Sequence, residues 1–323
     1  MDKEMKRIGV LTSGGDAPGM NAAVRAVVRA CVDRNIECIG IRRGWAGLIN
    51  GDIDRMNQLS VSHIIDRGGT ILYTARSKEF MTQEGQQKAY NNCRMFGLNG
   101  IVAIGGDGTF RGAQALSKFG VNVVGIPATI DNDISCTQYC IGYDTAANTA
   151  VECIDRLRDT MQSHERCSVV EVMGRNAGYL ALYVGLAVGA TAVLIPEGTL
   201  KPEHLFEKIR EARLNGRTHH MIVVAEGVGD SAQIAKNIKE EMSIDVRHTV
   251  LGHIQRGGKP SARDRLMATQ MGYHAVELLA QGQTNRIVCA NGEEICDIDI
   301  DEGLAQKKVI DPYQFKVLQA MTR

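Results

Sequence analysis

The sequence lacks the features that mark several large classes of protein. It has no excess of either charge, since Lys plus Arg (37) equals Asp plus Glu (37). A general binder of nucleic acid or of an anionic membrane carries a basic excess, so we expect neither partner. The nine cysteines are scattered and form no CxxC pair. Dispersed thiols in an odd number are typical of reduced cytosolic proteins and argue against a disulfide framework or a zinc site.

Two further absences concern location and domain organisation. The first residues, Met1–Arg7, are charged and lack the apolar core of a signal peptide, so we expect a cytoplasmic protein. With only six prolines, no linker is evident. A chain of 323 residues is too long for one small core and suits two α/β domains in close contact.

One uncharged run, Asn176–Pro196, is about long enough to cross a bilayer. However, Gly189 interrupts it, and the β-branched stretch Thr191–Ile195 ends at a proline. This pattern predicts a buried helix, a glycine stop and a buried strand rather than a membrane span.

The remaining hydrophobic pattern alternates between short apolar runs and amphipathic segments. Strands are predicted over Lys6–Leu11, Ile36–Ile41, Thr70–Tyr73, Ile101–Ile104, Val123–Pro127, Ser168–Met173, His220–Ala225 and Val246–Leu251. Helices are predicted to end near Asp33 and to cover Gln86–Phe96, Phe110–Lys118, Asp144–Met161, Pro202–Asn215, Ser231–Met242 and Ala262–Ala280, followed by a hairpin and a C-terminal helix. Such alternation is typical of parallel sheets with right-handed crossovers. We expect an α/β fold of two doubly wound, Rossmann-like domains, with the active site in the cleft between them.

Two acidic motifs follow predicted strands and carry the strongest functional signal. Gly105–Thr109 follows one strand and Thr129–Asp133 follows the next. Ligands of open α/β sheets bind beyond the carboxyl ends of the strands, so the two motifs are expected to converge. Asp107, set among glycines, could hold Mg²⁺, and Asp131 could take the proton of a substrate hydroxyl. This pairing is what phosphoryl transfer to an alcohol requires.

Weaker signals have ordinary readings as well. Gly14-Gly15 could receive a phosphate between a strand and a helix, although such pairs are more often tight turns. Arg76 could bridge phosphates, and Arg175 could stabilise a transition state, although a lone arginine is usually a solvated charge. Several other cationic or donor groups near strand ends suit a sugar phosphate, namely Arg166, Arg247, His253 and Arg256. The adjacent pair His219-His220 is read as structural, because neighbours on a strand face opposite ways.

Taken together, these residues resemble the bacterial ATP-dependent 6-phosphofructokinases. The resemblance runs from Ile8–Asn21 to His253–Gly258 and is most specific at Pro127–Asp133 and Val172–Arg175. It implies transfer of the γ-phosphoryl group of ATP to the 1-hydroxyl of fructose 6-phosphate, the committed step of glycolysis.

The resemblance also implies a role for each matching residue. Asp131 would be the base, Asp107 would hold Mg²⁺, Thr129 would hydrogen-bond near the transferring group, and Arg175 would stabilise its charge. ATP would be bound by Gly15, Arg76, Ser77, Gly106, Asp107, Gly108 and Thr109. Fructose 6-phosphate would be bound by Thr129, Ile130, Asp131, Arg166, Met173, Gly174, Arg175, Glu226, Arg247, His253, Ile254, Gln255 and Arg256.

At the level of the whole protein, the resemblance implies two discontinuous domains and an oligomer. Residues 1–141 and 254–304 would bind ATP, and residues 142–253 and 305–323 would bind fructose 6-phosphate. Arg166 and Arg247 would reach the active site of a neighbouring subunit, in a homotetramer with shared sites.

The phosphoryl donor follows from side-chain size. Pyrophosphate-dependent relatives usually carry Asp where this chain has Gly108 and Lys where it has Ala128, so the two small residues favour ATP. Three alternatives stay open. They are a pyrophosphate-dependent enzyme, an NAD kinase-like enzyme suggested by Gly105–Thr109, and a non-catalytic sugar-phosphate sensor.

Regulation is where the chain departs from the pattern. The family's effector site for ADP or phosphoenolpyruvate would use Arg25, Arg29, Arg158 and Arg217, which are all present. Gln58, His63, Thr191 and Asn215 differ from the residues common in relatives. Thr191 in particular replaces a carboxylate that would help to hold the Mg²⁺ of bound ADP. We therefore expect weak or altered effector control.

Overall fold

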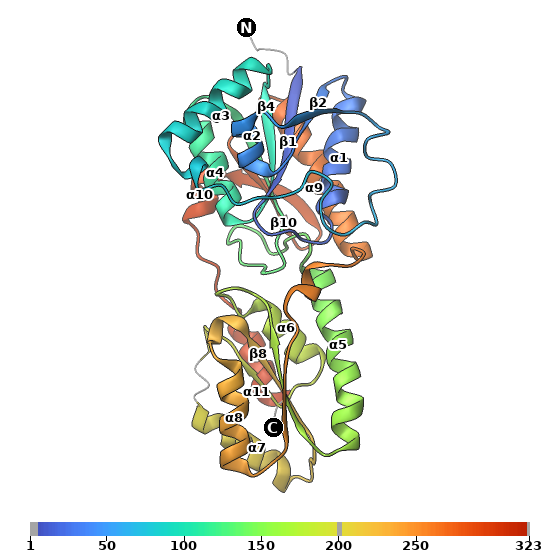
Figure 1. Ribbon diagram of the computed structural model, residues 1–323, viewed down its shortest axis with the longest axis vertical. Coiled ribbons are helices and arrows are strands. Elements are labelled where there is room, and N and C mark those ends of the chain that lie inside the picture. The colour runs from blue at the N-terminus through green and yellow to red at the C-terminus, as the bar shows by residue number, and fades with distance from the viewer. Residues whose placement is uncertain (1–5, 199–201, 322–323) are drawn as a thin grey trace. The chain divides into compact units, whose positions relative to one another are not determined.

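A computed structural model describes residues 6–198 and 202–321, which leaves most of the charged start of the chain outside the described residues. The chain forms two units, and each takes more than one stretch of sequence. Unit 1 consists of Met1–Thr129, Ile134–Asp144 and Arg256–Lys308. Unit 2 consists of Ile130–Asp133, Thr145–Gln255 and Val309–Arg323. Figure 1 shows each unit as a sheet covered by helices.

Unit 1 contains a seven-stranded sheet in the order β11-β10-β5-β4-β1-β2-β3. Its strands are β1 (Arg7–Ser13), β2 (Glu37–Ile41), β3 (Ile53–Met56), β4 (Gly100–Gly105), β5 (Asn122–Pro127), β10 (Arg286–Asn291) and β11 (Glu294–Asp299). The five central strands are parallel, but β3 and β11 pair antiparallel with β2 and β10. The predicted parallel α/β fold is confirmed, and the antiparallel pair β10–β11 is the hairpin that the sequence predicts after Ala280. The short turn at Gly292 (φ 64°) can join only antiparallel neighbours, because a parallel pair needs a long crossover.

Helices lie on both faces of this sheet. Helices α1 (Met20–Asp33) and α9 (Ala262–Ala280) pack closely on one face, where Gly272 permits the approach because a Cβ there would lie 2.6 Å from the Cβ of Ala26. The other face carries α2 (Gly44–Asn50), α3 (Gln83–Met95), α4 (Asp107–Ser117) and α10 (Ile300–Ala305) (Figure 1). Their core includes the stacked rings of Trp45 and Phe80, with centroids 4.7 Å apart.

Unit 2 contains a four-stranded sheet in the order β7-β8-β6-β9, and all its pairs are parallel. The strands are β6 (Cys167–Val172), β7 (Ala192–Leu194), β8 (His220–Ala225) and β9 (Val246–Val250). The helices are α5 (Tyr143–Ser163), α6 (Tyr179–Ala187), α7 (Pro202–Leu214), α8 (Ser231–Met242) and α11 (Pro312–Met321). Helices α7 and α8 bury Leu205, Ile209 and Ile238 against the sheet.

The long uncharged run folds as the sequence predicts. Helix α6 is followed by Gly189 in a left-handed conformation (φ 59°) and then by the buried strand β7. Within the described residues, no helix has the length and apolar composition needed to span a bilayer.

Two local predictions are wrong. Thr70–Tyr73 is a turn rather than a strand, closed by a hydrogen bond from the amide of Tyr73 to the carbonyl of Thr70, and Tyr73 has a φ of 55°. Helix α4 begins at Asp107 rather than at Phe110. Because glycine has a low helix propensity, the glycines at the start of α4 prevent propensity alone from predicting where this helix begins. Three short 3₁₀ helices, η1 (Glu79–Met81), η2 (Glu226–Val228) and η3 (Gly252–Arg256), complete the fold.

Candidate active site

Three loops of unit 1 begin at the same edge of its sheet. Ser13 pairs in register with Gly105, and Gly105 pairs with Pro127. The segments that follow these three residues are Gly14-Gly15, Gly106–Thr109 and Ala128-Thr129. Because parallel strands end together at one edge, the structure brings these predicted site residues together.

The second loop is also the N-terminus of helix α4. Gly106 is its N-cap residue, and a Cβ added at Gly108 would meet no atom within 4 Å. Backbone N–H groups at such a terminus can receive a phosphate, and the open space leaves room for it. Thr109 does not offer its hydroxyl to a ligand, because it is 3% exposed and donates a 3.0 Å hydrogen bond to the carbonyl of Ser13. Its role here is to hold the first two loops together.

Asp107 is the first residue of α4, and its side chain is 45% exposed. Its Oδ2 accepts a 2.8 Å hydrogen bond from Nε of Arg111, one turn later in the helix. Among the described residues, no three His, Cys, Asp or Glu side chains are grouped to hold a metal ion. The single carboxylate of Asp107 fits Mg²⁺, because this ion is often held by one or two carboxylates together with substrate phosphates. The sequence did not single out Arg111, although its i,i+4 spacing from Asp107 was visible.

Gly15 lies against the guanidinium group of Arg256. A Cβ added at Gly15 would lie 2.6 Å from Nη1 of Arg256, and this nitrogen donates a 3.0 Å hydrogen bond to the carbonyl of Asp16. Arg256 therefore lies in unit 1 beside the predicted phosphate loop.

The loop that carries Arg76 and Ser77 is attached to the end of β1. Thr74 donates a 2.7 Å hydrogen bond to the carbonyl of Gly14. Buried Asn21 donates to the carbonyls of Arg67 and Gly68 and accepts a 2.8 Å hydrogen bond from the amide of Ile71. The sequence does not predict this role of Asn21, because it depends on contacts with residues 46 to 50 positions away.

The segment after β5 passes from one unit to the other. Thr129 ends the first stretch of unit 1, whereas Ile130–Asp133 belongs to unit 2. Asp131 is 6% exposed, and Asn132 adopts a left-handed conformation with a φ of 49°. Asparagine tolerates that region better than most residues, so it suits the turn beside the predicted base.

Unit 2 brings together several of the predicted sugar-phosphate residues. Oε1 of Glu226 accepts hydrogen bonds from the amides of Gly174 (3.2 Å) and Arg175 (2.5 Å). Both of these residues have positive φ, 139° and 56° respectively. The fully buried Gln255 accepts a 3.4 Å hydrogen bond from the amide of Met173. Glu226 and Gln255 thus fix the backbone from which Arg175 projects.

A second cluster joins the two arginines that were expected to reach a neighbouring subunit. Oδ2 of Asp245 lies 2.5 Å from Nε of Arg166 and 3.2 Å from Nη2 of Arg247. The sequence did not identify Asp245, since nothing in its local pattern shows that it faces both arginines. His253 and Ile254 are exposed on η3.

The four effector candidates divide between the units. Arg25 and Arg29 lie on α1 in unit 1, and burial followed by the charge of Arg29 lowers the pKa of Arg25. Arg158 and Arg217 lie in unit 2, where Arg158 donates to the carbonyl of Val188. Thr191 is 4% exposed, and its hydroxyl accepts a 3.2 Å hydrogen bond from the amide of Met221.

Comparisons with known proteins agree with one another. The sequence model of the family described as "Phosphofructokinase" matches residues 7–279. A curated protein named ATP-dependent 6-phosphofructokinase, from Clostridium botulinum (strain Loch Maree / Type A3), is 51% identical over 319 residues, which cover 99% of this chain and 100% of that one. A protein of the same name from Clostridium tetani (strain Massachusetts / E88) is 52% identical over 318 residues, covering 98% and 100%.

Solved structures of phosphofructokinases have the same fold as this chain. Phosphofructokinase from Saccharomyces cerevisiae has a TM-score of 0.86 and 32% identity, covering 98% of this chain and 46% of that chain, so this protein spans less than half of the yeast chain. A pyrophosphate-dependent phosphofructokinase from Nitrosospira multiformis has a TM-score of 0.86 at 20% identity, covering 99% and 92%. At that identity the likeness shows the fold alone.

Proposed function

This chain belongs to the phosphofructokinase family, and we propose that it transfers the γ-phosphoryl group of ATP to the 1-hydroxyl of fructose 6-phosphate. The proposal rests on the convergence of the Gly14, Gly106 and Ala128 loops at one edge of the unit 1 sheet. Asp107 lies at the N-terminus of α4, which can receive a phosphate, and Asp131 lies two residues beyond Thr129. Full-length relatives at 51–52% identity that are named ATP-dependent support the same reaction.

In this proposal, the ATP-binding domain, residues 1–141 and 254–304, largely coincides with unit 1. The backbone at Gly15 and Gly106–Thr109 receives the nucleotide phosphates, and Arg76 and Ser77 complete the ATP site. The exposed carboxylate of Asp107 holds Mg²⁺. When bound, this cation neutralises charge on the phosphates during transfer.

The fructose 6-phosphate domain, residues 142–253 and 305–323, largely coincides with unit 2. Asp131 takes the proton of the 1-hydroxyl, Thr129 hydrogen-bonds near the transferring group, and Arg175 stabilises its charge. Glu226 and Met173-Gly174 position the sugar. The 6-phosphate is held by His253, by Arg256 and, from a neighbouring subunit, by Arg166 and Arg247, which Asp245 keeps together.

The choice of ATP rests on space at the phosphate loop. A Cβ at Gly108 would meet nothing within 4 Å, and Ala128, at the start of the third loop, is 1% exposed and donates a 3.0 Å backbone hydrogen bond to the carbonyl of Gly105. An Asp and a Lys at these positions would alter both the charge and the room that ATP needs. The pyrophosphate-dependent, NAD kinase-like and non-catalytic alternatives are not favoured.

We further propose a cytoplasmic homotetramer with weak or altered effector control. The support for weak control is Thr191, which supplies no carboxylate and whose hydroxyl is engaged by the backbone of β8. Sub-millimolar ADP or phosphoenolpyruvate is expected to leave the half-saturating concentration of fructose 6-phosphate nearly unchanged. A strong shift of that concentration would contradict the proposal.

The reaction is tested by a coupled assay with fructose 6-phosphate and Mg²⁺, with ATP and pyrophosphate offered separately. Turnover with ATP alone is the expected result. Turnover with pyrophosphate would overturn the donor assignment, and activity with neither donor would favour the non-catalytic sensor.

A further inference from the structure

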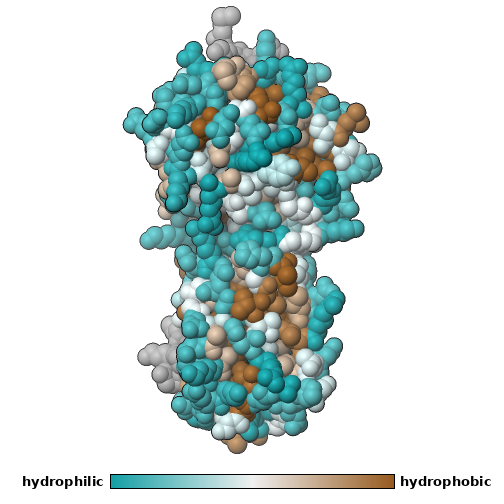
Figure 2. Space-filling view, in the orientation of Figure 1, coloured by the Kyte–Doolittle hydropathy of each residue, from teal (hydrophilic) through white to brown (hydrophobic). Residues whose placement is uncertain are grey.

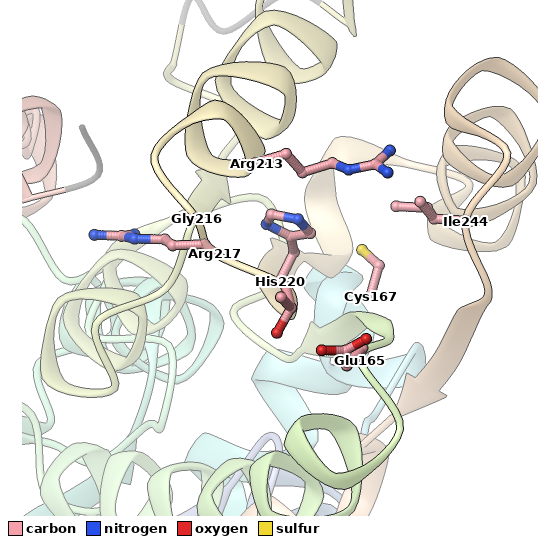
Figure 3. A pocket seen from close by; sticks show the side chains of 8 residues that line it. Glu165, Cys167, Arg213, Gly216, Arg217, His220 and Ile244 are labelled. Atoms are coloured by element: carbon pink, nitrogen blue, oxygen red, sulfur yellow. The ribbon is translucent and has the colours of Figure 1, made fainter.

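Unit 2 contains a cavity of about 240 Å³, and Arg217 is the only proposed substrate or effector residue among those that line it (Figure 3). It lies where β6 and β8 begin, and it is lined by their first residues, Cys167 and His220. These two residues pair in register on neighbouring parallel strands, so both side chains lie on the same face of the sheet. The loop between α7 and β8 forms one wall of the cavity.

This cavity and the proposed sugar contacts Met173 and Glu226 lie at opposite ends of the same strands, whereas Arg166 lies between the lining residues Glu165 and Cys167 in the sequence. Cys167 and His220 begin the strands that end at Val172 and Ala225, next to Met173 and Glu226. Five residue steps at about 3.3 Å each separate the two ends by about 17 Å. The cavity is therefore distinct from the place in unit 2 where Met173 and Glu226 lie.

His220 is the most informative residue of the cavity. It is 2% exposed, yet neither ring nitrogen has a hydrogen-bond partner among the described residues. A buried polar atom without a partner is destabilising, so native proteins pair nearly all such atoms, with ordered water where necessary. Since His220 lines the cavity, an occupant of the cavity can supply the missing hydrogen bonds.

The surrounding charges decide the kind of occupant. Arg213 extends its guanidinium group over the cavity between His220 and Ile244 (Figure 3), and its nearest recorded partner is the carbonyl of Met242 at 3.5 Å. Arg217 lines the cavity but directs its side chain away from His220 (Figure 3). Glu165 is the one carboxylate among the lining residues. The rim thus carries two arginines against one acid.

Burial determines the protonation states of His220 and Cys167, the two strand residues that line the cavity. Burial, and then the charges of Arg213, His219 and Arg217, lower the pKa of His220 from 6.5 to about 4. At pH 7 the neutral ring has one N–H donor and one acceptor nitrogen. Burial raises the pKa of Cys167 to about 12, so its thiol stays protonated and is not a nucleophile.

We propose that this cavity binds a phosphate group, either as inorganic phosphate or as part of a small phosphate ester, held by Arg213 and His220. The planar guanidinium group matches phosphate oxygens, and the neutral His220 ring either donates its N–H to a third oxygen or accepts a hydrogen bond from a protonated one through its other nitrogen. About 240 Å³ equals the volume of roughly eight waters, which leaves room for a phosphate with a short carbon chain.

The test is a titration of the full-length protein followed by the imidazole NMR signals. The probes are inorganic phosphate and glycerol 3-phosphate, with sodium chloride at matched ionic strength. The His220 signals are identified by their loss in His220→Gln. We expect a saturable shift of these signals that chloride does not produce, and at least a ten-fold weaker response in Arg213→Met.

Two matched variants make the result specific. Arg210→Met removes an arginine one turn earlier in α7 that does not line the cavity, and Arg247→Met breaks the neighbouring arginine cluster. Both are expected to leave the His220 response unchanged. The proposal is overturned if the signals do not move, if Arg213→Met behaves like the wild type, or if Arg247→Met alone removes the response.

Calorimetry supplies a second measurement that does not need His220→Gln to fold. Loss of one phosphate-binding event in Arg213→Met, but not in Arg210→Met, supports the site. Ten-fold tighter binding of glycerol 3-phosphate than of phosphate identifies an ester as the occupant, whereas equal binding identifies the inorganic ion. Kinase turnover at saturating substrates is expected to be unchanged in Arg213→Met, so this proposal and the proposed function fail independently.

Discussion

The proposed chemistry depends on one carboxylate, Asp131, held in a turn that leaves it 6% exposed. Replacing it with asparagine keeps its size and removes its ability to accept a proton. Asp131→Asn is expected to lower kcat by about 10²- to 10⁴-fold, the range that a positioned base contributes, with KM changed little. Steady-state kinetics with ATP and fructose 6-phosphate measure both constants.

The matched control for this variant lies in the same turn. Asp133→Asn removes a carboxylate two residues away that has no assigned role, and it is expected to keep kcat within a few-fold of the wild type. Near-normal turnover in Asp131→Asn, or an equal loss in Asp133→Asn, would remove Asp131 from the role of base.

Among the elements, the N-terminus of α4 makes the donor preference testable. Gly108→Ala adds a Cβ to open space and is expected to be nearly neutral, because Gly108 does not adopt a positive φ. Gly108→Asp places a negative charge at the phosphate loop and is expected to raise KM for ATP at least ten-fold through repulsion. An acidic residue in the first helical turn does not destabilise the helix, so the loss reports on ATP binding.

Circular dichroism verifies that both Gly108 variants fold, and kinetics with varied ATP give the two KM values. An unchanged KM in Gly108→Asp would show that the nucleotide phosphates do not pass this residue. An equal rise in Gly108→Ala would show that size, and not charge, decides the preference.

His220, the first residue of β8, makes the stability of the fold at acid pH testable. His220 has a pKa of about 4 in the folded chain and 6.5 as the ordinary value. Between these pH values the unfolded state binds more protons, so the free energy of unfolding falls as the pH drops from about 6.5 towards 4. Between a pH well above 6.5 and a pH well below 4, the protonation of His220 lowers the free energy of unfolding by about 3 kcal/mol in total. In His220→Gln, which does not titrate, the loss of Tm over this range is expected to be smaller than in the wild type.

A non-binding buffer is required for this comparison, since phosphate is the proposed ligand of the same histidine. His219→Gln serves as the control, because it leaves His220 in place and removes only a minor cause of its lowered pKa, so most of the wild-type slope is expected to remain. Parallel Tm profiles for the wild type and His220→Gln would show that the histidine does not titrate between the two states.

The elements also show how far the sequence alone could reach. Strand β8 and helices α8 and α9 begin and end where the hydrophobic pattern predicts, because each buries one clear face or run. Edge strand β3 was missed, since only two of its four residues are even partly buried and its antiparallel partner is set by tertiary pairing.

The predicted site residues follow the same rule. Asp107 could be named because its motif directly follows a predicted strand, whereas Glu226 could be named only because the family resemblance implies it. Asn21 and Asp245 act through contacts with loops or strands that are distant in sequence. A local sequence pattern cannot predict such contacts.

For the whole molecule, the decisive question is whether one chain makes a complete active site. Asp131→Asn would inactivate the site that its own chain forms, whereas Arg247→Met would impair only the site of its neighbour. Neither homo-oligomer has an intact site. In a mixed oligomer, a chain with intact Asp131 beside a chain with intact Arg247 forms one.

Co-assembly of Asp131→Asn and Arg247→Met subunits is therefore expected to restore activity well above that of either variant alone at low fructose 6-phosphate. The control mixes Asp131→Asn with a chain that carries both substitutions, which offers no intact Asp131 and is expected to stay inactive. Activity is measured after the subunits are dissociated and reassembled together. If the mixture never exceeds the average of its parents, each site is built from a single chain, and Arg247 then serves its own subunit or has only a structural role beside Asp245.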